Sequence, residues 1–284
     1  MKKIVPHVVV IALFAVIALA FFYPVLQGKG IFQSDIVQYT GMAKERNDYR
    51  QTENKETYWT NSAFGGMPTY QLGAQYPNDF VKQLDRTLRF LPRPADYLFL
   101  YFIGFYVLLL VLKVDYKNAF LGAIAFGLST YLIIILGAGH NAKAHAIAYF
   151  APLLAGILLV FQRKYLWGGL LTAVALALEI CANHFQMTYY LLLLVLLLGV
   201  GFLYKVIKEK QLKDFGKAMA VLLGAVVVSV LANATLLLTT REYADWSTRS
   251  KSTLTITPDG TPKEQNSGLS KEYITEYSYG ISES

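Results

Sequence analysis

Residues 187–204 read "MTYYLLLLVLLLGVGFLY", a block of eighteen residues without a charged side chain. An α-helix needs about 20 mainly apolar residues to cross the roughly 30 Å hydrocarbon core of a bilayer. The length and composition of this block therefore predict a transmembrane helix. Similar apolar blocks recur along most of the chain.

The overall composition supports the same class of protein. Of the 284 residues, 55% are hydrophobic and 16% are charged, and the mean hydropathy is positive. A soluble domain carries about 25% charged residues. We therefore predict an all-α polytopic membrane protein.

About seven transmembrane helices are predicted, and a large outer loop over residues 27–96 follows the first of them. The polar residues 239–284 are expected to begin an extracytoplasmic segment that continues in a longer protein, so the transmembrane module covers residues 1–238. The predicted spans are residues 4–26, 97–112, 119–136, 144–161, 166–182, 187–204 and 218–238.

Basic residues cluster in alternate short connectors, which predicts the topology. By the positive-inside rule, the N-terminus is cytoplasmic, and the first loop and the C-terminal segment face outward. An alternative is that "ALA" at residues 18–20 marks the cleavage site of a signal peptide. The connectors with this charge contain Lys2, Lys3, Lys113, Lys117, Arg163, Lys164 and the five lysines of residues 205–217.

The net charge of +7 follows from these topology signals, so we expect no nucleic-acid partner. Because Cys181 is the only cysteine in the sequence, no intrachain disulfide can form. It lies in an apolar block, which indicates an inert packing residue.

The outer loop is too long for a simple connector. Ser34 is a suitable N-cap, Asp35 suits the first turn of a helix, and apolar residues then recur at helical spacing. A second amphipathic pattern covers residues 80–91. We predict two helices lying in the membrane interface, joined by an ordered loop, "WTNSAFGGMPTYQLG".

Polar residues inside the apolar region gather in two short stretches on the predicted outer leaflet. Such residues are costly in a membrane and are usually functional. Each also has a structural explanation: a helix-turn amide, a snorkelling lysine, a core histidine or a paired acid. The first stretch contains His140, Asn141, Lys143 and His145, and the second contains Glu179, Asn183, His184 and Gln186.

The sequence does not support a metal site. His7 falls on the opposite leaflet from the other three histidines, and no HExxH or paired-cysteine spacing occurs. Lysine with histidine suits a phosphate, because both are hydrogen-bond donors that carry or gain positive charge.

Five segments resemble a known family. "SDIVQY", "FGGMPTYQ", "GHNAKAHAIAYFAPL", "NHFQMTYYLL" and "GLSKEYITEYSYG" are similar in order to segments of the bacterial YfhO family of integral membrane proteins. More broadly, one span followed by a large outer loop with an early acid resembles membrane glycosyltransferases of the GT-C superfamily. The chain looks like the N-terminal portion of such a protein, with a GT-C-like module.

This resemblance implies a transferase in the bacterial cytoplasmic (inner) membrane. Such enzymes take a sugar from a polyprenyl-phosphate donor and pass it to an extracytoplasmic acceptor, a cell-envelope glycan or polymer. Asp35 stands at the position of the catalytic base, without the adjacent carboxylate that would favour a bound metal. The expected substrate-binding residues are His140, Asn141, Lys143, His145, Asn183, His184 and Gln186.

Two other functions remain open. The first is a transporter or flippase in which Glu179 and the histidines relay protons or other ions. The second is a non-catalytic membrane assembly protein whose outer loop is a docking surface.

Overall fold

The computed structural model describes residues 4–247, 250, 254–262, 271–276 and 278, and these are predominantly helical. Lys2, Lys3 and part of the "GLSKEYITEYSYG" segment lie outside the described residues. The chain forms two compact units. Unit 1 comprises residues 1–44 and 75–234, and unit 2 comprises residues 45–74 and 235–284. The single boundary predicted near residue 238 therefore differs from this division, because part of the outer loop groups with the C-terminal segment.

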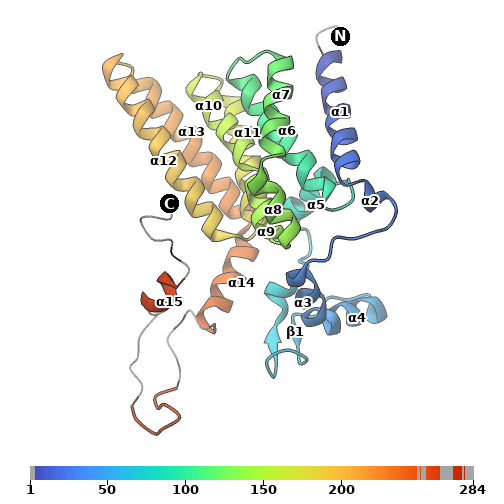
Figure 1. Ribbon diagram of the computed structural model, residues 1–284. Helices are drawn as coiled ribbons and strands as arrows, with labels where there is room; N and C mark the ends of the chain where they lie inside the picture. The colour runs from blue at the N-terminus through green and yellow to red at the C-terminus, as the bar shows by residue number, and fades with distance from the viewer. Residues whose placement is uncertain (1–3, 248–249, 251–253, 263–270, 277, 279–284) are drawn as a thin grey trace. The chain divides into compact units, whose positions relative to one another are not determined.

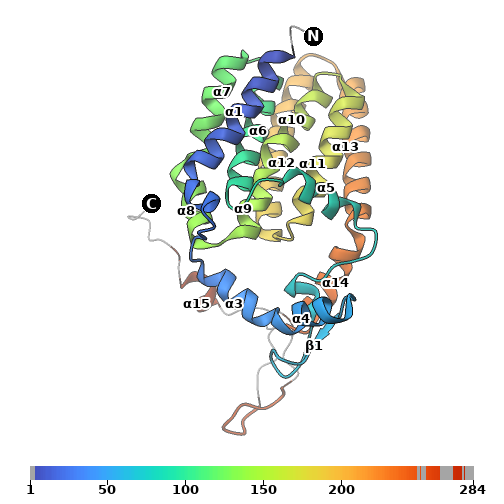
Figure 2. The same ribbon diagram turned by 90° about the vertical axis from the view of Figure 1, so that its right-hand side faces the viewer.

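Unit 1 is a helical bundle, and Figures 1 and 2 show its long helices running side by side. Helices α6 and α10 are its centre, since α6 packs on α1, α7 and α10 while α10 packs on α11. Its elements are α1 (Val5–Phe21), α2 (Tyr23–Leu26), α3 (Ser34–Met42), α5 (Phe80–Leu88), α6 (Ala95–Val111), α7 (Tyr116–Gly127), α8 (Thr130–Ala138), α9 (Asn141–Ala148), α10 (Phe150–Phe161), α11 (Tyr165–Cys181), α12 (Phe185–Lys208) and α13 (Leu212–Ala232).

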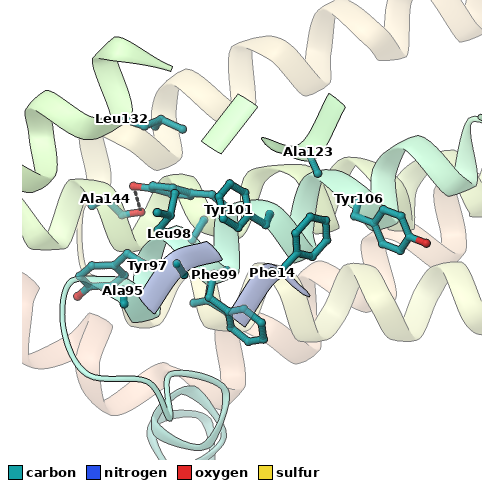
Figure 3. Packing of buried hydrophobic residues seen from close by; sticks show 14 of the residues in the cluster. Phe14, Ala95, Tyr97, Leu98, Phe99, Tyr101, Tyr106, Ala123, Leu132 and Ala144 are labelled. Carbon is teal, nitrogen blue, oxygen red and sulfur yellow. Dashed lines mark hydrogen bonds between the residues drawn. The ribbon is translucent and has the colours of Figure 1, made fainter. Parts of the chain in front are cut away.

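Aromatic side chains fill the core of this bundle (Figure 3). Phe14 of α1 is fully buried and stacks on Phe102 of α6 and on Phe120 of α7. The hydroxyl of Tyr101 donates to the carbonyl oxygen of Ala144 at 3.0 Å, so a polar group inside the core has its partner.

Among the described residues, three helical segments are long and apolar enough to cross a membrane: Asn141–Phe161, α12 and α13. A fourth is possible if α7 and α8 count as one span, although they are bent by 45° at the break between them. Helices α1, α6 and α11 are apolar and have 17 residues each. The structure thus contains three or four helices of spanning length, and the count of seven stays a prediction.

Three predicted elements differ in detail from the structure. The block 4–26 is broken at Phe22, where α1 ends, and the block 218–238 is broken at Asn233, between α13 and α14 (Ala234–Asp245). The hydropathy pattern does not reveal either break, because the residues on both sides are apolar. Ser34 is the first residue of α3, and Gln33 occupies the N-cap.

The turns with basic residues and the turns with the polar stretches lie at opposite ends of unit 1 (Figure 1). In Figure 1 the α6–α7, α10–α11 and α12–α13 turns lie at the end of unit 1 where α1 begins. Each of these turns contains a basic residue with a left-handed backbone: Lys113, Arg163 or Lys210. The α8–α9 and α11–α12 turns lie at the opposite end. That end holds both of the polar stretches of the sequence.

Unit 2 contains α4 (Lys44–Glu53, from Glu45 onward), the short antiparallel strands β1 (Trp59–Thr60) and β2 (Met67–Pro68), the 3₁₀ helix η1 (Thr69–Leu72), most of α14 and α15 (Lys271–Thr275). Arg46 is buried and forms two hydrogen bonds with the Glu56 carboxylate, at 2.6 and 2.8 Å. Gln71 donates to Thr240 at 3.1 Å, which links the loop segment to α14.

Glycines bring α10 and α11 into close contact. A Cβ atom at Gly168 would lie 2.5 Å from the backbone nitrogen of Val160, and one at Gly156 would lie 2.6 Å from that of Thr172. Small residues at such crossings allow the backbones of membrane helices to approach each other.

We therefore expect Gly168→Ala to destabilise the protein by about 1–3 kcal/mol, the usual cost of overpacking. Thermal unfolding in detergent measures this effect. Gly199→Ala is the matched control, because a Cβ there meets no atom within 4 Å. Since alanine favours helix over glycine, an equal rise in stability for both variants would contradict the close contact.

Candidate functional site

The turn between α8 and α9 begins the site. Gly139 ends α8 in the left-handed conformation with φ of 89°, and the backbone N–H of His140 donates to the carbonyl oxygen of Ile135 at 3.1 Å. His140 is then the N-cap of α9, and Asn141 and Lys143 lie in its first turn. The glycine thus reverses the chain and leaves polar side chains at the start of the new helix.

Gln33 attaches the start of α3 to this turn. Its Nε2 donates to the carbonyl oxygen of Leu136 at 2.5 Å, and its Oε1 accepts from Nδ2 of Asn141 at 3.4 Å. A Cβ atom at position 139 would lie 2.9 Å from Cβ of Gln33. Only glycine therefore fits both the backbone conformation and this close approach.

Asp35 lies in the first turn of α3, beside His140. Its Oδ2 is 3.2 Å from Nδ1 of His140. Both side chains are about half exposed, 51% for Asp35 and 48% for His140, so a ligand from outside can reach them. The structure thus brings together the acid of the first loop and a histidine of the first polar stretch.

His184, at the N-cap of α12, lies close to Lys143 and His140. Burial lowers the pKa of its imidazole, and electrostatic interactions with Lys143 and His140 lower that pKa further. Among the described residues, Nδ1 of His184 and Oδ1 of Asn141 are buried polar atoms without a hydrogen-bond partner. Such atoms are costly unless a ligand or water satisfies them.

The remaining residues of the second stretch are used differently. Asn183 ends the α11 turn with a left-handed backbone, φ 54°. Gln186 is exposed and donates to the hydroxyl of Tyr190, one turn along α12, at 2.8 Å. Glu179 is fully buried, where one carboxylate oxygen accepts from Thr188 at 2.9 Å and the other has no partner among the described residues.

His145 belongs to a separate buried cluster around Asp85. The Asp85 carboxylate of α5 is fully buried and contacts Nε2 of His145. It also accepts from the hydroxyl of Tyr149 at 2.9 Å and from Nη2 of Arg89 at 2.6 Å. Arg89 in turn donates to Asp96 of α6 at 3.3 Å. His145 therefore faces a buried carboxylate rather than an open pocket.

The sequence pattern did not single out Asp85. Burial by itself would raise the pKa of its carboxyl group, but hydrogen bonds from His145 and Arg89 hold that pKa below the ordinary value. Asp85 and Arg89 are four residues apart, a spacing that also occurs on solvated helix faces. That spacing does not distinguish Asp85 from an exposed acid, and its partners at the end of α9 are about 60 residues away in the sequence.

No group of three or more His, Cys, Asp or Glu side chains comes together within the part of the chain that the structure describes. The N-terminal ends of α3, α9 and α12 bring the carboxylate of Asp35 and the basic side chains of His140, Lys143 and His184 to one region. This combination suits proton transfer next to a bound anion.

Replacing Asp85 by alanine leaves Arg89 and His145 without their buried partner. Loss of one member of a buried pair typically costs about 3–5 kcal/mol, and we expect that loss of unfolding free energy for Asp85→Ala. Glu209→Ala is the control, since Glu209 is exposed and its ion pair with Lys205 is long, at 4.0 Å. We expect its unfolding free energy to change by no more than about 0.5 kcal/mol. Chemical denaturation in detergent compares the two. Similar small losses would contradict the cluster's role.

The same carboxylate makes stability depend on pH. Because the folded pKa of Asp85 lies below the ordinary 3.8, its contribution is complete above the ordinary value and is lost as the pH falls through the folded one. The stability difference between wild type and Asp85→Asn should therefore be constant near neutral pH and shrink below about pH 4. A difference that grew on acidification would refute this assignment.

Comparison with known proteins adds no identity. No family model, no curated protein and no solved structure matches this chain. The resemblance to the YfhO family thus stays a prediction, and function is argued from the site.

Proposed function

We propose that the chain is a membrane glycosyltransferase, or the N-terminal module of one, that uses a polyprenyl-phosphate-linked sugar. The observation that carries this proposal is the 3.2 Å contact between Asp35 and His140. It puts an accessible acid of the loop beside a cationic, hydrogen-bonding turn of the bundle. General-base catalysis next to an anionic leaving group requires both.

Asp35 is the proposed base. It lies at the start of α3, and Gln33 fixes that start to the α8–α9 turn, so its carboxylate has a defined position. The carboxylate would take the proton of an acceptor hydroxyl as that oxygen attacks the sugar carbon. His140 would hold Asp35 in place and carry part of the balancing charge.

The phosphate of the donor would lie against the basic groups. Lys143 supplies a point charge, and His184 supplies a ring nitrogen that has no partner within the described residues. Negative charge grows on the leaving phosphate oxygen during transfer, so fixed donors there stabilise the transition state more than the ground state.

A seven-span arrangement in a bacterial inner membrane completes the proposal. Helices α1, α6 and α11 have 17 residues each, which is the lower limit for a membrane span. With the bent α7–α8 pair and the three longer helices, they make seven. The candidate site then faces outward, because the basic turns lie at the other end of unit 1.

Asp35→Asn should abolish sugar transfer while leaving folding intact, because the amide keeps the shape but accepts no proton. We expect a loss of at least about 10²-fold in rate. The assay offers polyprenyl-phosphate-linked glucose, mannose and N-acetylglucosamine in turn to bacterial membranes that contain the protein. Glu53→Gln, an exposed acid of α4, is the matched control and should retain full activity. Normal turnover by Asp35→Asn would end the assignment.

A transporter is the second candidate, favoured by two observations. The α7–α8 pair is bent by 45°, and broken spans are typical of transporter sites. Glu179 is buried inside the bundle with one oxygen unpartnered among the described residues. Proton uptake by proteoliposomes that is lost in Glu179→Gln but kept in Asp35→Asn would favour transport over transfer.

A further inference from the structure

The loop of residues 57–73 contains no charged side chain and is held by several hydrogen bonds. No charged residue occurs from Thr57 to Asn78, although this stretch is rich in Tyr, Asn, Gln, Ser and Thr. Large flat aromatic rings beside small polar residues are the composition of surfaces that bind ligands by stacking and hydrogen bonding. Unit 2 contains the whole loop.

Glu45 holds the loop in one conformation. Its carboxylate accepts from the hydroxyl of Thr60 at 2.7 Å and from the backbone N–H groups of Asn61 and Ser62 at 3.0 and 2.7 Å. These hydrogen bonds lower the pKa of Glu45 to about 2, so the anchor stays ionised. The Thr69 backbone N–H donates to the carbonyl oxygen of Tyr58 at 3.1 Å and closes the hairpin.

Trp59 is presented as a flat surface. One side of its indole ring packs on Gly66, where a Cβ atom would lie 2.7 Å from Cζ2 of the ring. Its Nε1–H donates to Oδ1 of Asn61 at 3.1 Å, so the ring cannot rotate freely. The side chain is nevertheless 52% exposed, so a ligand can reach part of the indole.

The chain accepts strain to keep this arrangement. Phe64, Gly65 and Gly66 all have positive φ angles of 53°, 75° and 119°, and Phe64 is 85% exposed. A non-glycine residue in this region costs about 1–3 kcal/mol and persists where the surroundings demand it. Because Phe64 is so exposed, packing of its side chain does not account for this conformation.

We propose that the 57–73 loop is a binding platform for a neutral saccharide, whose sugar ring stacks on the exposed part of the Trp59 indole. The C–H groups on one face of a pyranose suit the negative face of an indole ring. The amide nitrogen of Asn61 makes no hydrogen bond within the described residues and is available as a donor to ring hydroxyls. A neutral ligand fits because residues 57–73 carry no charged side chain to pair with an ionic one.

Other partners fit less well. A membrane-inserting tip would carry basic residues beside its aromatics, and residues 57–78 have none. The three exposed aromatic side chains, Tyr58, Trp59 and Phe64, would bury at most about 150–250 Å² each, which together is below the roughly 800 Å² that each partner buries in a stable protein complex. That this saccharide is the acceptor rests on the proposed function, whereas its binding does not.

The test is isothermal titration calorimetry on the whole chain in nanodiscs, with maltohexaose, cellohexaose and chitohexaose as probes. We expect saturable binding of at least one of them. Trp59→Ala should weaken it roughly tenfold or more, and Trp59→Phe should restore part of it, since a smaller ring still stacks. Trp246→Ala is the matched control, because Trp246 is 82% exposed outside the loop, and it should bind normally.

Gly66→Ala supplies a second variant that keeps the indole but moves it, and it should also weaken binding. Glu53→Gln should bind the probe unchanged. Because the titration contains no donor sugar, a failed transferase assignment would leave the platform standing. The proposal is overturned if none of the three probes binds saturably or if Trp59→Ala binds as wild type does. It is also overturned if Trp59 fluorescence, measured with Trp167 and Trp246 replaced by Phe, responds to phosphatidylglycerol vesicles and not to sugars.

Discussion

The buried carboxylate of Asp85 is the constraint on which the arrangement of unit 1 depends. A charge without solvent must find partners, and its partners come from Arg89 in the next turn of α5 and from His145 and Tyr149 at the end of α9. Arg89 then extends the cluster to Asp96 of α6. This fixes α5 against the bundle and sets the rotation of α9. The first turn of α9, with the candidate site, is placed by the same contacts.

The sequence predicted a mainly helical chain and placed several helices closely. The block 187–204 lies within α12, and the block 166–182 corresponds to α11, because a long uncharged stretch allows only a helix in a bilayer. The helix breaks at Phe22 and Asn233 and the 45° bend between α7 and α8 were not predicted. An apolar block indicates that the segment lies in an apolar environment. Where the helix bends or breaks depends on the neighbours that it packs against, which the block does not reveal.

The candidate site was predicted in part. Leaflet position suggested that Asp35 and the first polar stretch lie at one level, and the structure places Asp35 beside His140. Gln33 was missed, since its partners are a main-chain oxygen and an amide more than a hundred residues away, which leave no local pattern. His145 and Gln186 have the expected residue types but bond to Asp85 and Tyr190, and residue type does not reveal such pairings.

Gly139 has a consequence for how this protein tolerates mutation. The residue has no functional group, yet the φ of this turn is unfavourable for any residue with a side chain, and a side chain would also push Gln33 away from the turn. A screen that scores only loss of function would therefore find position 139 as intolerant as its reactive neighbours. Intolerance at this position would report the separation between two chain segments and would carry no information about bond making or breaking.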